Sequence, residues 1–65
     1  MASRVDLGLT ICDIKLKGFV LPHGTPVVVA VMKEHWVVTV VQGEYEGTKF
    51  RMSPSQASEA ISIAL

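Results

Sequence analysis

Cys12, two histidines and six carboxylates are the side chains of this chain that could take part in nucleophilic, acid–base or metal chemistry. Neither His23, in a turn, nor His35, between two apolar runs, has a nucleophile nearby in the sequence. The cysteine and histidines lack the spacing of a metal site, and Gly43 and Gly47 lack the pattern of a phosphate-binding loop. We therefore predict a non-enzymatic protein with no catalytic residue, metal or cofactor, surface histidines and a buried Cys12 thiol.

Four of the six basic residues form two pairs that each share one side of a strand. Lys15 pairs with Lys17, and Lys49 pairs with Arg51, because residues two apart on a strand point the same way. If the two strands are neighbours, the pairs form one positive patch. Such a patch could hold nucleic-acid phosphates or a small anionic ligand.

Three further side chains complete the candidate binding residues. Tyr45 lies in a loop flanked by glycines, where its ring could stack on a ligand. Trp36 could anchor a partner protein, although packing against Met32 in the core is the simpler interpretation for so large an apolar ring. His35 lies at the tip of the predicted central hairpin, beside Trp36.

Length, charge and cysteine content limit the kinds of protein this can be. The chain has 65 residues, which we assign to a single domain, residues 1–65, with a small core. Its formal net charge of zero provides no overall field that would attract nucleic acid. No apolar run approaches the roughly 20 residues of a membrane span, so we expect no membrane partner. One unpaired cysteine favours the cytoplasm and excludes an internal disulfide, so we expect support from a homo-oligomer, first of all a dimer.

The most informative pattern is a hairpin built from two apolar runs, residues 27–32 and 36–41. Neither run alternates between apolar and polar residues, so both faces of the hairpin are expected to leave water. A three-residue loop, residues 33–35, would set the register. That loop predicts three opposite pairs: Met32 with Trp36, Ala30 with Val38, and Val28 with Val40.

Shorter strands and one helix surround this hairpin. Apolar alternation predicts strands over 7–11, 14–16 and 48–52, with a bend or bulge at residues 12–13, where the alternation slips by one residue. Residues 19–21 lead into a turn at 22–24. Ser53 is a good helix N-cap, followed by Pro54 and by Gln56 at the capping-box position. The helix would carry one apolar stripe, formed by Ala57, Ala60, Ile61, Ala64 and Leu65.

These elements predict an α+β fold. We expect a small antiparallel sheet of about four to five strands, arranged as a meander, with one C-terminal helix packed on one face. The alternative is an SH3-like small β-barrel with a C-terminal helix. In the first arrangement the helix covers one face of the hairpin, and the second face is a large apolar surface on a monomer. A second subunit that covers this surface gives a two-fold dimer.

The segment 49–56, Lys-Phe-Arg-Met-Ser-Pro-Ser-Gln, followed by an amphipathic helix, resembles the strand-then-helix plan of the single-stranded-DNA-binding transcriptional coactivator family. The resemblance covers the last third of the chain and implies a small dimer with four strands before the helix. This chain has Thr48-Lys49 where the family has a Lys-Gly pair before the final strand. A likeness of fold does not by itself carry function.

The functional hypothesis is therefore a small homo-oligomeric binding protein with a regulatory or inhibitory role, of the kind that phages and mobile elements encode. It would bind a partner protein or sequester a small anionic ligand. The alternative, ranked second, is single-stranded nucleic-acid binding through Lys15, Lys17, Lys49, Arg51 and an aromatic side chain.

Overall fold

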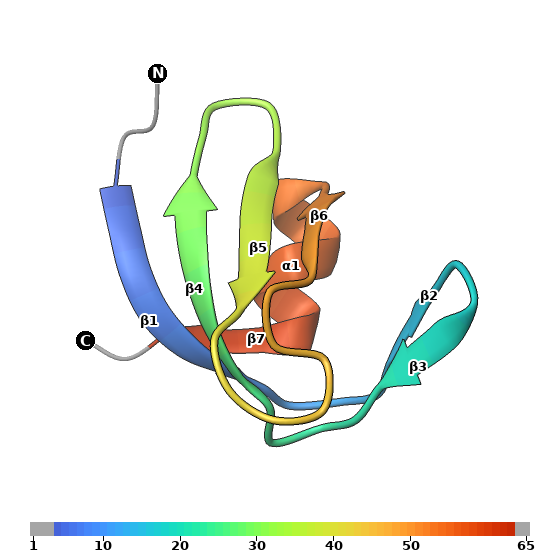
Figure 1. The fold of residues 1–65 in the computed structure, drawn as a ribbon. Coiled ribbons are helices and arrows are strands. Elements are labelled where there is room, and N and C mark those ends of the chain that lie inside the picture. The colour runs from blue at the N-terminus through green and yellow to red at the C-terminus, as the bar shows by residue number, and fades with distance from the viewer. Residues whose placement is uncertain (1–3, 64–65) are drawn as a thin grey trace.

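A computed structural model describes residues 4–63 and shows an α+β fold with two antiparallel sheets (Figure 1). The larger sheet has five strands in the order β6-β5-β4-β1-β7. Its strands are β1 (Arg4–Thr10), β4 (Pro26–Val31), β5 (Trp36–Val40), β6 (Lys49–Met52) and β7 (Ile61–Ile63). The smaller sheet is a hairpin of β2 (Ile14–Leu16) and β3 (Phe19–Leu21), and the single helix is α1 (Pro54–Ala60). This confirms the predicted fold class. The five-stranded sheet is not closed, so the SH3-like barrel alternative is not the architecture of this chain.

The predicted slip in alternation at residues 12–13 marks the division between β1 and β2. The chain bends there, leaves the large sheet, forms the β2–β3 hairpin and returns to enter β4 beside β1 (Figure 1). A network of hydrogen bonds closes the base of this excursion. Thr25 N–H donates to Thr10 Oγ1 over 2.9 Å, and the hydroxyls of Thr10 and Thr25 both donate to the Pro22 carbonyl, over 2.8 and 2.6 Å. Both threonines are buried.

The register of the central hairpin differs by one residue from the prediction. The β4–β5 connection has four residues, because β4 ends at Val31 and the Met32 N–H donates to the His35 carbonyl over 3.1 Å. A shift of one residue exchanges the two faces of one strand relative to the other. The observed pairs are therefore Val31 with Trp36, Ala30 with Val37, Val29 with Val38, Val28 with Thr39, and Val27 with Val40.

The helix begins as predicted but ends early. Ser53 caps it, with the Gln56 N–H donating to Ser53 Oγ over 3.3 Å, and Pro54 occupies the first turn. The predicted stripe through Ile61 is wrong, because Ile61 has extended backbone and begins β7, pairing with Thr10. Ala64 and Leu65 lie outside the described residues. The helix is therefore followed by a strand, which differs from the four-strands-then-helix plan of the coactivator family.

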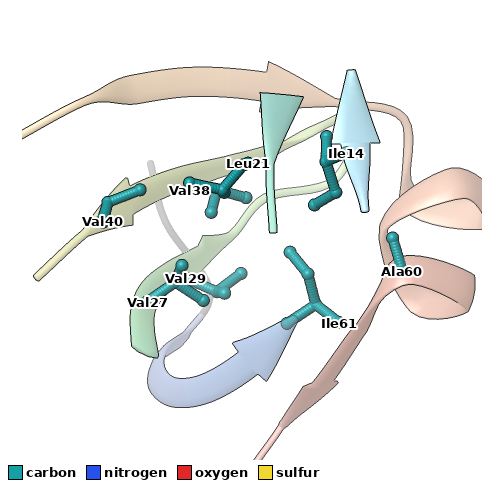
Figure 2. Packing of buried hydrophobic residues seen from close by; sticks show 8 residues of the cluster. All are labelled: Ile14, Leu21, Val27, Val29, Val38, Val40, Ala60 and Ile61. Carbon is teal, nitrogen blue, oxygen red and sulfur yellow. The ribbon is translucent and has the colours of Figure 1, made fainter. Parts of the chain in front are cut away.

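The core lies on the inner face of the five-stranded sheet, which is the face that carries Val27, Val29, Val38 and Val40. Figure 2 shows their side chains together with those from the hairpin, the helix and β7. These additional members of the cluster are Ile14, Leu21, Ala60 and Ile61. The helix thus covers only part of the inner face, and side chains of the β2–β3 hairpin and of β7 also pack there. No helix among residues 4–63 is both long and apolar enough to cross a membrane.

Candidate interaction surface

The opposite face of the five-stranded sheet, called the outer face below, carries two rows of side chains that cross four strands. Residues that pair across neighbouring strands point to the same side of a sheet, so the register defines these rows. The first row is Val5, Ala30, Val37 and Arg51, and the second is Leu7, Val28, Thr39 and Lys49. Each row is largely apolar and ends in a cation on β6.

The most exposed apolar part of the outer face is β1, where three apolar side chains project into solvent. Val5 and Leu7 are each 63% exposed and Leu9 is 50% exposed. Their neighbours on β4 and β5 are half-buried, so the apolar surface continues across the sheet. A single exposed apolar residue needs no explanation, but a continuous apolar patch on a folded chain is typical of an interaction site.

Among residues 4–63, no carboxylate forms an ion pair with the two cations at the β6 end of the outer face. Lys49 and Arg51 are exposed, and their neighbours on β5 are Thr39 and Val37. Within residues 4–63, the ion pairs join other residues: Arg4 to Asp6, and His23 to Asp13. Arg4 Nε lies 2.5 Å from Asp6 Oδ2, although the angles are not those of a hydrogen bond. The charges of Lys49 and Arg51 are thus available to a partner molecule.

The four predicted basic residues do not form one patch. Lys15 and Lys17 belong to the β2–β3 hairpin, and β2 pairs with β3 rather than with β6. Lys15 instead borders a groove of about 450 Å³ between α1 and the β1–β2 connection. The groove is lined by Cys12, Asp13, Ile14, Lys15, Met52, Gln56, Glu59 and Ala60. The two basic pairs could be identified from the sequence. The distance between the pairs depends on which strands are neighbours, which the sequence does not show.

The predicted aromatic contacts also lie elsewhere than the outer face. Tyr45 stacks on Phe19, with ring centroids 4.5 Å apart and planes 19° apart, so it joins the 42–48 loop to the hairpin. The neighbouring Glu44 raises the pKa of the Tyr45 hydroxyl. Trp36 is half-buried on the inner face, opposite Val31 and Met52, and packs against the core. This agrees with the simpler interpretation of Trp36 as a core residue.

His35 lies in the β4–β5 loop at the tip of the hairpin and is half-buried. It lines a small hollow of about 200 Å³ together with Met32, Lys33 and Glu34. Its carbonyl closes the loop by accepting the Met32 N–H.

The structure brings Asp13 and His23 together, a pairing that was not predicted from the sequence. Asp13 Oδ1 accepts the His23 backbone N–H over 3.0 Å and lies 3.2 Å from the His23 ring Nδ1. These two contacts hold the pKa of the Asp13 carboxyl below its usual value. The pair links the β1–β2 connection to the turn at residues 22–24. Cys12 is exposed rather than buried, because it occupies the bend next to this pair.

Metal chemistry has no site in the part of the chain that the structure covers, since no group of three or more histidine, cysteine or acidic side chains there could hold an ion. Comparison with protein-family models, with curated proteins and with solved structures finds no match to this chain. The outer face, with its exposed apolar side chains on β1 and its two cations on β6, is the candidate interaction surface.

Proposed function

We propose that this chain is a non-enzymatic binding protein that assembles as a homodimer through the outer face and regulates a partner protein. One observation carries the proposal: Val5, Leu7 and Leu9 form an exposed apolar ridge on a sheet whose other face is already buried. Burial of apolar surface is the main favourable term in association. Small domains commonly gain stability from an oligomer interface. The unpaired Cys12 thiol fits a cytoplasmic protein.

A two-fold dimer fits the distribution of charge on this face. Two sheets that pack face to face keep their strands roughly aligned. If the two-fold axis runs parallel to the strands and passes over β1, the β1 strands of the two copies face each other and each β6 lies beyond β7 of the other copy. Lys49 and Arg51 of the two copies then lie at opposite rims of the interface, and the apolar ridges meet near its centre. This arrangement buries apolar side chains while it leaves the cations in water.

Light scattering at micromolar concentration tests the proposal, with an expected mass of two subunits. Leu7→Lys should weaken the dimer, because each copy loses the remaining burial of a side chain that is 63% exposed in the monomer. That burial contributes roughly 1–2 kcal/mol per copy, so the dissociation constant should rise roughly 30- to 700-fold. Leu7→Lys should still fold, since position 7 faces water in the monomer.

Val20→Lys is the matched control. Val20 is also exposed and apolar, at 46%, but it lies on β3, outside the five-stranded sheet. The Val20→Lys dimer should have the same dissociation constant as the unmodified dimer. A monomeric mass for the unmodified chain, or equal effects of the two lysines, would refute the outer face as the interface.

A further inference from the structure

The free edge of β6 presents the backbone groups of its two cationic residues. The Val40 N–H donates to the Thr48 carbonyl and the Val40 carbonyl accepts the Gly47 N–H, so the backbone of Val40 faces the β6 side. Alternate residues of an antiparallel strand face the same neighbour, so Val38 and Trp36 also face β6. Their partners Phe50 and Met52 therefore turn their backbone groups inward, and Lys49 and Arg51 turn theirs outward. Among residues 4–63, no strand pairs with this edge.

The side chains along this edge alternate between charge and apolar surface. Lys49 and Arg51 lie on the outer face, and neither forms an ion pair with a carboxylate of residues 4–63. Phe50 and Met52 lie on the inner face, half-buried and packed against the core. Met52 also borders the groove of about 450 Å³, whose apolar lining includes Ile14 and Ala60. A strand laid beside β6 would therefore meet cations on one side and the apolar side chains of Phe50 and Met52 on the other.

We propose that β6 accepts an extended segment of a partner protein as a sixth strand, in which acidic and apolar residues alternate. The acidic side chains would lie opposite Lys49 and Arg51, where oppositely charged cross-strand pairs are favourable. The apolar side chains would lie beside Phe50 and Met52, at the mouth of the groove. The outward backbone groups of β6 would supply the hydrogen bonds common to peptide recognition by strand addition. This site is separate from the proposed dimer interface and does not depend on it.

The same residues exclude a second copy of this chain from the edge. Two β6 edges paired with each other would bring Lys49 and Arg51 of one copy beside those of the other, and like charges opposite one another on neighbouring strands repel. Cations on an edge strand are a common protection against such pairing. Here they also select the partner, because a segment with alternating carboxylates replaces repulsion with attraction.

The probe is the peptide acetyl-Glu-Val-Glu-Leu-Glu-Val-amide, titrated into the isotope-labelled full-length chain at low salt. Nuclear magnetic resonance should show the largest amide shifts at residues 49–52. Replacing every glutamate of the peptide by lysine should abolish binding. N-methylation of the peptide amides that face β6 should abolish binding, and N-methylation of the alternate amides should not, because only one set can bond to the strand.

Charge exchange supplies the matched variants. Lys49→Glu with Arg51→Glu should weaken binding of the acidic peptide about tenfold or more and should create binding of the lysine peptide. Lys17→Glu with Lys33→Glu changes the net charge by the same amount at two exposed positions away from the edge and should leave binding of the acidic peptide unchanged. Absence of binding, equal effects of the two methylation patterns, or shifts centred on β1 would overturn the proposal. The same titration with Leu7→Lys separates this result from the oligomeric state.

Discussion

Replacing Thr10 by valine should be among the more damaging single changes in this small fold, although the two side chains have nearly the same shape. Thr10 is 2% exposed. Its hydroxyl donates to the Pro22 carbonyl and accepts the Thr25 N–H, at the point where the β2–β3 hairpin leaves and rejoins the large sheet. Valine fills the same space but leaves the Thr25 N–H without its acceptor. The Pro22 carbonyl keeps one donor, the Thr25 hydroxyl.

The expected size of the effect follows from these contacts. A lost hydrogen bond costs about 1 kcal/mol, and a buried donor left without an acceptor costs about 1–3 kcal/mol. The extra buried methyl group of valine returns about 0.8 kcal/mol. We therefore expect the free energy of unfolding to fall by about 2 kcal/mol. For a domain of this size, that corresponds to a fall in Tm of about 8–16 °C.

Thermal and urea unfolding, followed by circular dichroism at one protein concentration, measure the effect. Thr10→Ser keeps the hydroxyl and loses only a buried methyl group, so it should cost about 1 kcal/mol. Thr39→Val is the control on the outer face, where residues 4–63 offer the threonine side chain no hydrogen bond; its effect should stay within about 0.5 kcal/mol. The reasoning fails if Thr10→Val destabilises the fold no more than Thr39→Val, or if Thr10→Ser is as damaging as Thr10→Val.

Two further predictions concern the packing of β7 and the response to acid. Gly8→Ala would place its Cβ 2.9 Å from the Ser62 carbonyl oxygen and 3.0 Å from Ile61 Cγ2, so β7 must shift. Urea unfolding should show that the free energy of unfolding falls by about 1–3 kcal/mol. Unchanged stability would contradict the close packing of β1 on β7. The pKa of Asp13 is lowered in the folded state by its contacts with His23, so its contribution to stability is complete above the unfolded pKa of about 3.9 and is lost as the pH falls through the folded value. Unfolding measured between about pH 5 and pH 2 should therefore lose stability less steeply in Asp13→Asn than in the unmodified chain, and identical slopes would show that the contact with His23 has no effect on the folded state.

Elements governed by neighbouring residues could be predicted from the sequence. Ser53 and Pro54 mark the helix start because capping depends on the residues of one turn. The break at Cys12-Asp13 is visible because a strand shows its buried face in its own alternation. The helix end could not be predicted in this way. Ile61-Ser62-Ile63 fits either an apolar helix stripe or a strand, and only pairing with β1 selects the strand.

The sequence showed which kinds of side chain the candidate surface would contain, but not which residues would share it. The two valine-rich runs already indicate that both faces of the hairpin are apolar. Which residues share a face depends on the loop, and the fourth loop residue, Met32, placed Val29 opposite Val38 and moved Val37 to the outer face. The two basic pairs could be identified from the sequence, yet their separation between the β2–β3 hairpin and β6 depends on strand order. Strand order is set by contacts between residues far apart in the chain.

The sequence by itself therefore determined that this chain folds as a small α+β domain with more apolar sheet surface than its own helix can cover, because periodicity and capping are local properties. Only the tertiary structure decided that Val5, Leu7 and Leu9 form the exposed ridge on β1 and that Lys49 and Arg51 lie three strands away, on the edge strand β6. The physical reason is that a face and an edge exist only after strands distant in sequence have paired in one register.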